Sequence, residues 1–148
     1  MASWKPTEAY VVPQAITDVS TTQNLPLGTI IRGRHETYGA GEFIYLLGVA
    51  STVAGSWVVY NSDAFTPILI VPNAIGPVAV AMGANVASTY GWYQIQGEAL
   101  AVAADVADSG KVYIDTVPGR CDDALVAGDR VKGAKWTSVE DTSATPVA

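Results

Sequence analysis

The sequence predicts an all-β fold, either a small β-barrel or a β-sandwich of about 8–9 short strands with an extended N-terminal arm. Short runs of Val, Ile, Tyr, Trp and Ala recur along the chain, and Gly, Pro, Asn or Asp separates them about every eight to twelve residues. Residues 92–96 show the clearest alternation, because the glutamines share a face with Trp92 while Tyr93 and Ile95 share the other. No segment sustains a helical period.

Each of these runs is expected to form one strand. The expected strands cover residues 28–34, 42–47, 56–60, 66–71, 78–82, 91–96, 98–103, 112–115 and 130–132. In 78–82 and 100–103, aliphatic residues alternate with alanine, so each strand has one face of small side chains. Another sheet, or another chain, can approach such a face closely.

The chain is expected to form one domain with a loose segment at each end. Residues 1–26 contain three prolines and a polar run, which predicts an extended arm ordered only by what it lies against. Residues 27–136 hold all the expected strands and form the single β domain. Residues 137–148 are rich in Ser, Thr, Asp and Pro, and we expect a flexible C-terminal tail.

Formal charge is nearly absent from the middle of the sequence. Residues 43–97 carry one charged side chain, Asp63, whereas protein surfaces normally carry many. We therefore expect other protein to cover part of this stretch, around residues 57–65 and 85–96. A membrane span is not expected in the apolar residues 68–84, because Pro72 and Pro77 interrupt them.

The charge distribution disfavours nucleic acid as a direct partner. The net charge is −6, from 14 acidic residues against 8 Lys and Arg, and no Lys or Arg lies between Arg34 and Lys111. The sequence thus shows no basic stripe for phosphates. Residues 1–6 lack the features of a signal peptide, and the single Cys121 cannot form an internal disulfide, so synthesis in the host cytoplasm is expected.

Residues suited to catalysis are scarce, and we expect no enzyme, no cofactor and no metal site. His35 is the only histidine, and we expect it in a solvated loop between two strands. The carboxylates next to Cys121 raise the pKa of its thiol, which predicts an inert side chain. Acidic residues cluster in 105–115 and 122–129 without the spacing of a calcium loop. A catalytic pair of carboxylates remains a distant alternative.

Residues 76–81 and 90–97, preceded by 48–53, resemble the capsid decoration, or cement, proteins of tailed bacteriophages. The resemblance spans about residues 28–131 and rests on a few short sequence segments and on the general residue pattern, without a catalytic signature. It implies a small β-rich protein that binds the major capsid protein on the outside of an expanded head. It also implies a homo-oligomer, with a trimer favoured, and a terminal arm that reaches a neighbouring subunit.

We therefore expect a structural virion protein on the capsid exterior that stabilises the mature shell without covalent chemistry. The residues expected at the capsid or oligomer interface are Ala2, Trp4, Tyr10, Val12, Trp57, Tyr60, Phe65, Tyr90, Trp92 and Tyr93. The alternatives are a carbohydrate-binding or receptor-binding head-fibre module, in which the aromatic rings stack on sugars, and another minor virion structural protein. Aromatic side chains of an all-β protein are more often core or interface anchors than sugar platforms.

Overall fold

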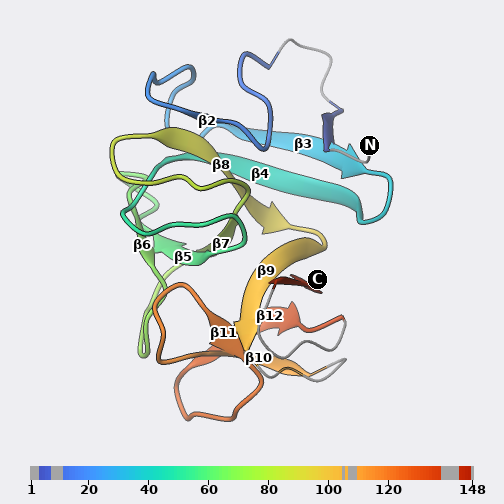
Figure 1. Ribbon diagram of the computed structural model, residues 1–148, viewed down its shortest axis with the longest axis vertical. Helices are drawn as coiled ribbons and strands as arrows, with labels where there is room; N and C mark the ends of the chain where they lie inside the picture. Colours follow the sequence, from blue (N-terminus) through green and yellow to red (C-terminus); the bar gives the residue numbers. More distant parts are fainter. Residues whose placement is uncertain (1–3, 8–11, 105, 107–109, 138–143, 148) are drawn as a thin grey trace.

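The computed structural model describes residues 4–7, 12–104, 106, 110–137 and 144–147. Within these residues the predicted all-β class is confirmed, and the strands form one eight-stranded and one five-stranded sheet (Figure 1). No helix in the described part of the chain has the length and hydropathy of a transmembrane segment.

Every strand expected from the sequence is present. They are β3 (Ile30–His35), β4 (Gly39–Leu47), β5 (Trp57–Tyr60), β6 (Pro67–Leu69), β7 (Val78–Ala81), β8 (Tyr90–Gln96), β9 (Ala99–Ala104), β10 (Lys111–Ile114) and β12 (Arg130–Lys135). Their boundaries differ from the expected ones by a few residues. Alternation of side chains and the turn residues between runs were sufficient to locate them.

Further short strands come from segments without a strand signal. They are β1 (Lys5–Pro6), β2 (Val19–Ser20), β11 (Cys121–Asp122) and β13 (Ala144–Val147). The last lies in the stretch expected to be a flexible tail, and that expectation is wrong for residues 144–147. They pair antiparallel with β9, which otherwise would be an open edge of the smaller sheet.

Both sheets are open along their described strands. The larger has the order β1-β3-β4-β8-β7-β5-β6, with β2 also paired to β8, and the smaller has the order β12-β10-β11-β9-β13. Of the two architectures expected, this arrangement fits a sandwich of two sheets and not a single closed barrel.

The strand register defines two faces of the larger sheet. Phe43 and Val80 both lie opposite Gln94, and Val80 also lies opposite Trp57. Because paired residues project to the same side, these residues and Trp92 form one face, which we call the tryptophan face. The other face carries a buried cluster of Ile44, Leu46, Val58, Ala79, Ala81 and Tyr93.

Two different parts of the chain cover the tryptophan face. At the end formed by β3, β4 and β8, the N-terminal segment packs on it with Ile16. At the end formed by β5 and β7, the smaller sheet packs on it, and Trp57 lies in the shared core. Figure 1 shows these two covers at the top and the bottom of the molecule.

The chain passes from the larger sheet to the smaller at the turn between β8 and β9. Gly97 has a φ of +96°, and a Cβ there would lie 2.4 Å from the carbonyl oxygen of Ala40. Only glycine fits this conformation and this close approach. β9 then extends away from the larger sheet and is the first long strand of the smaller one along the chain (Figure 1).

Residues 14–20 are more tightly held than the expected arm. Gln14 is buried, and its side-chain amide donates to the carbonyl oxygens of Asp18 (2.8 Å) and Tyr90 (2.9 Å). Its Oε1 accepts hydrogen bonds from the Tyr45 hydroxyl (2.7 Å) and the Asn24 amide (3.0 Å). The packed body therefore begins before the expected boundary at residue 27, because the buried side chains of Gln14 and Ile16 anchor a stretch whose composition is otherwise that of a loop.

We expect Gln14→Ala to lower the free energy of unfolding by about 2 to 4 kcal/mol, because it leaves several buried polar partners without a hydrogen bond. Urea denaturation followed by tryptophan fluorescence measures this change. Gln23→Ala is the matched control, since Gln23 is exposed, and we expect a change within about 0.5 kcal/mol. Equal stability of the two variants would show that residues 14–20 do not belong to the cooperative core.

Candidate functional site

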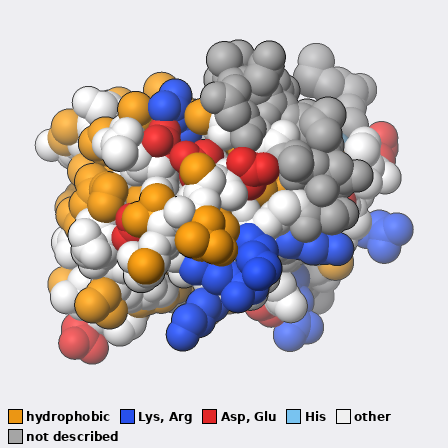
Figure 2. Space-filling view, turned by 90° about the horizontal axis from the view of Figure 1, so that it is seen from below, with side chains coloured by type: hydrophobic (Ala, Val, Ile, Leu, Met, Phe, Trp, Pro, Cys, Tyr) orange, Lys and Arg blue, Asp and Glu red, His pale blue; other side chains and the backbone are white. Residues whose placement is uncertain are grey.

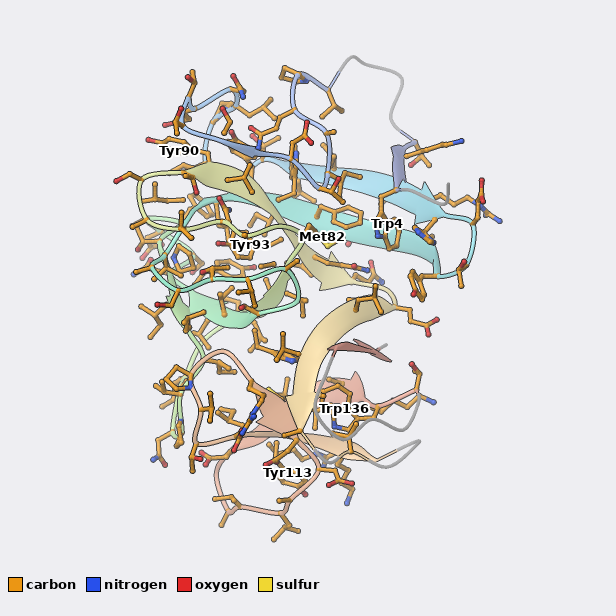
Figure 3. All side chains as sticks on the ribbon, in the orientation of Figure 1. Trp4, Met82, Tyr90, Tyr93, Tyr113 and Trp136 are labelled. Carbon is orange, nitrogen blue, oxygen red and sulfur yellow. The ribbon has the colours of Figure 1, made fainter. Side chains whose placement is uncertain are left out.

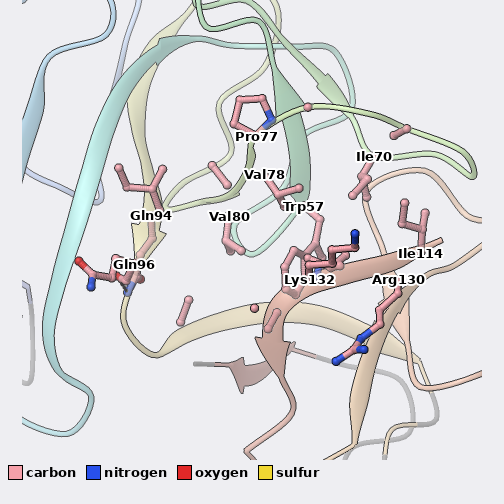
Figure 4. A pocket seen from close by; sticks show the side chains of 18 of the residues that line it. Trp57, Ile70, Pro77, Val78, Val80, Gln94, Gln96, Ile114, Arg130 and Lys132 are labelled. Carbon is pink, nitrogen blue, oxygen red and sulfur yellow. Dashed lines mark hydrogen bonds between the residues drawn. The ribbon is translucent and has the colours of Figure 1, made fainter. Parts of the chain in front are cut away.

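A groove of about 630 Å³ lies between the tryptophan face of the larger sheet and the smaller sheet (Figure 4). Val78 and Val80 of β7 and Gln94 of β8 line one side. Residues 130–134 of β12 line the other side, and Trp57 lies between the two. The groove thus has walls from both sheets, and the turn at residue 97 borders it.

Apolar side chains dominate the lining, and two cations stand at its β12 side. Arg130 and Lys132 are exposed, and neither forms an ion pair with a carboxylate of the described residues. Val131 between them is buried in the core that joins the sheets. Alternation along β12 therefore places the two cations on one side of the strand and the apolar side chain on the other.

Gln94 provides a buried polar group in the same lining. Its Nε2 donates to the carbonyl oxygens of Gln96 and Glu98, both at 3.0 Å. Its Oε1 is buried and accepts no hydrogen bond from the described part of the chain. Buried acceptors in proteins normally have a donor, so this atom can accept from a group that enters the groove.

A cationic surface extends from the groove along the smaller sheet. Lys111 of β10 lies opposite Lys135 of β12 in the register, and both are exposed. Together with Arg130 and Lys132 they gather basic side chains at one place, which Figure 2 shows beside a group of hydrophobic side chains. Their spacing in the sequence had indicated no basic stripe, because the pairing of β10 with β12 is tertiary.

Five of the exposed large hydrophobic side chains lie in neighbouring connections at the same end of the molecule. They lie in the connections from β6 to β7, β10 to β11 and β11 to β12, which are at the bottom of Figure 1. We call this surface the apolar end, and its residues are Val71, Ile75, Val117, Leu125 and Val126. Ile75 is 95% exposed and Leu125 is 78% exposed. The Asn73 N–H donates to Asp129 Oδ1 at 2.7 Å and ties two of these connections together.

The aromatic residues expected at an interface are used largely within the fold. Trp57, Trp92 and Tyr93 are buried, so the expectation that they anchor a partner is wrong. Trp92 donates its Nε1–H to the Gln14 carbonyl at 3.0 Å, and Trp57 donates to the Val102 carbonyl at 3.1 Å. These rings fill the cores that form where other parts of the chain cover the two faces of the larger sheet.

The remaining expected interface residues are half-buried or lie outside the described residues. Trp4, Val12 and Tyr90 pack at the edge of the cluster under the N-terminal segment (Trp4 and Tyr90 are labelled in Figure 3). Tyr60 and Phe65 pack at the edge of the cluster around Tyr93. Ala2 and Tyr10 lie outside the described residues. The structure therefore does not bring the expected residues together on one surface.

His35 is a packing residue and not the solvated loop residue that we expected. It ends β3, is 9% exposed, and its ring stacks on Tyr38 with centroids 4.6 Å apart. Its Nδ1 accepts hydrogen bonds from the backbone N–H groups of Thr37 (3.0 Å) and Tyr38 (3.4 Å). These bonds hold the tight turn that joins β3 to β4.

Cys121 is fully buried in the core between the sheets. Burial raises the pKa of its thiol well above the ordinary value, and the nearby carboxylates of Asp122 and Asp115 raise it further. The thiolate is the reactive form, so this arrangement makes the side chain unreactive in the folded protein.

The carboxylates near Cys121 are engaged in local contacts. Asp115 forms an ion pair with Arg120 and accepts the backbone N–H of Thr116 at 2.6 Å. Burial alone would raise the pKa of Asp115, but these donors outweigh it and hold the pKa below the ordinary value. No group of three or more potential metal ligands occurs among the described residues.

Sequence reasoning missed the apolar end, although a signal for it was present. Large aliphatic residues stand inside turn sequences at both places, as Ile75 does between Asn73 and Pro77 and Leu125 does between Asp123 and Gly128. Turns are normally exposed, so aliphatic residues within them indicate an apolar surface.

No protein-family model, no curated protein and no solved structure matches this chain.

We expect Cys121 in the native protein to react with Ellman's reagent at least about a hundredfold more slowly than in the urea-unfolded chain. The physical reason is the burial that excludes the reagent and disfavours the thiolate. Absorbance measurements at neutral pH check the rate, and Cys121→Ala serves as the blank. Rapid native labelling would contradict the packing described for β11.

We expect Asp115→Asn to lower the free energy of unfolding by about 1 to 2 kcal/mol at about pH 7. A carboxyl whose pKa is depressed in the folded state stabilises the protein above its unfolded pKa and loses this contribution as the pH falls through its folded pKa. The difference between wild type and variant should therefore shrink below the ordinary value of 3.8. Asp63→Asn in an exposed turn is the control, and an unchanged difference in acid would refute the ion-pair argument.

Proposed function

We propose that this chain is a structural virion protein that binds the outer surface of a bacteriophage capsid and stabilises the mature shell. The observation that carries the proposal is the apolar end, where the aliphatic side chains of Ile75 and Leu125 are largely exposed to solvent. Exposed aliphatic residues on neighbouring loops are typical of surfaces that bind other proteins. The resemblance of residues 76–81 and 90–97 to capsid decoration proteins supports the shell as the partner.

The proposed mechanism is thermodynamic and involves no covalent chemistry. A protein that binds the expanded shell, and not the unexpanded one, stabilises the expanded form by mass action. Repetition of the contact over a lattice strengthens it further through multivalency. In this proposal the protein is a homo-oligomer, with a trimer favoured by the resemblance, and it is made in the host cytoplasm before it joins the capsid exterior.

The described residues of the N-terminal arm do not carry the proposed shell contact. The ring of Trp4 lies against Phe43, with centroids 4.9 Å apart, and β1 pairs with β3 of the same chain. These contacts use the arm within the domain, so we place the major shell contact at the apolar end instead.

Neither the carbohydrate-binding alternative nor the distant enzyme alternative gains a specific observation from the described residues. A carbohydrate-binding platform needs exposed rings, whereas Trp57 and Trp92 are buried. His35 and Cys121, which offered the simplest routes to acid–base or nucleophilic chemistry, have packing roles.

We expect the double variant Ile75→Glu, Leu125→Glu to bind expanded phage heads at least about tenfold more weakly than the wild type, because it places charges in an apolar contact. Both positions are exposed, so the fold should be retained. Co-sedimentation with expanded and unexpanded heads of the phage that encodes the chain measures the binding.

Val53→Glu is the matched control, since Val53 is an exposed aliphatic residue in a turn outside the apolar end. It should bind expanded heads as the wild type does. A wild-type protein that binds neither form of the head would refute the proposed function, and equal loss in both variants would refute the assignment of the contact to the apolar end.

A further inference from the structure

We propose that the groove beside β12 binds an extended peptide segment whose acidic and apolar side chains alternate, and that this segment adds to the smaller sheet as a further strand. The inference deepens the proposed function, because there the segment would belong to a shell protein. Its chemistry follows from the groove and can be tested without a capsid.

β12 offers an unpaired edge to the groove. Among the described strands it pairs only with β10, so its other edge presents backbone N–H and C=O groups. Residues 130–134 all line the groove, which places this stretch of backbone along one wall. Gly133 has a φ of +82°, so the extended part of this edge lies at residues 130–132. An added strand satisfies such an edge through main-chain hydrogen bonds.

Charge selects the side chains of the incoming segment. Arg130 and Lys132 flank a buried valine and project from one side of β12, without a carboxylate partner among the described residues. Residues directly opposite them on an added strand would share that side. Carboxylates at alternate positions of the segment therefore meet both cations, which is charge complementarity at a site that its own domain leaves unfilled.

The apolar lining of the groove and one buried hydrogen-bond acceptor determine which side chains suit the remaining positions of the segment. Pro77 and Val78 line the groove without being buried in the core, so they provide contacts for aliphatic side chains that alternate with the carboxylates (Figure 4). Gln94 Oε1 can accept a hydrogen bond from the segment. A volume of about 630 Å³ is within the usual range of ligand sites and is large enough for a short stretch of chain.

The test uses fluorescence anisotropy of a short labelled peptide in which Val and Glu alternate, at concentrations where the peptide is monomeric. We expect saturable binding to the full-length protein. Peptides that alternate Val with Lys, or Val with Ser, should bind at least about tenfold more weakly. The Val–Glu peptide with N-methyl groups at alternate residues should lose binding, because it lacks the backbone donors that an added strand requires.

The double variant Arg130→Glu, Lys132→Glu should bind the Val–Glu peptide at least about tenfold more weakly and should gain affinity for the Val–Lys peptide. This reversal of preference cannot result from unfolding. Lys111→Glu, Lys135→Glu is the matched control, because it makes the same change in net charge outside the groove lining. We expect its affinity for the Val–Glu peptide to change by no more than about threefold.

Several results would overturn the inference. They are an absence of Val–Glu binding, equal losses in the two double variants, unimpaired binding of the N-methylated peptide, and tighter binding of a single-stranded oligonucleotide that depends on Arg130 and Lys132. Failure here is distinguishable from failure of the proposed function. Peptide binding without recruitment to phage heads would refute the shell as partner, whereas recruitment without peptide binding would refute only the groove.

Discussion

The packing of two tryptophans against small side chains of β9 joins the two sheets, and the rest of the structure depends on it. Trp57 of the larger sheet and Trp136 of the smaller meet edge to face, with ring centroids 5.9 Å apart and planes at 79°. Each indole N–H donates to a backbone carbonyl of the smaller sheet at 3.1 Å, so burial leaves neither donor unsatisfied. Ala99, Ala101 and Ala103 share this core and leave room for rings that larger residues would displace.

This contact explains why a groove exists where it does. The smaller sheet covers one end of the tryptophan face, and the N-terminal segment covers the other. At Gly97 the chain turns from β8 of the larger sheet into β9 of the smaller one, and the groove borders this turn. A site at the junction of two packed layers is formed by rigid strands on both sides, which favours recognition of a segment of defined shape.

The surface that we propose as functional differs from the one that aromatic residues had indicated. Trp92 and Tyr93 are large and apolar, and a sheet covered on both faces buries such residues first. We propose that partners bind instead at the apolar end, with Ile75 and Leu125, and at the cations of β12 beside it. Within residues 43–97 exposed positions are about as frequent as buried ones, so the chain's own core explains only part of the scarcity of charge, and we propose an interface for the rest.

The sequence by itself determined the all-β class and the location of nine strands, because alternation and turn chemistry act over a few residues. It also predicted an unreactive Cys121 from the neighbouring carboxylates, although burial, which is the larger cause of the raised thiol pKa, comes from tertiary structure. Tertiary structure decided the pairing of β1, β2, β11 and β13, whose short segments become strands only beside an open partner. It likewise decided the gathering of Lys111 with Lys135, the burial of Gln14 and the groove itself, because each joins residues far apart in the chain whose proximity depends on how the two sheets pack.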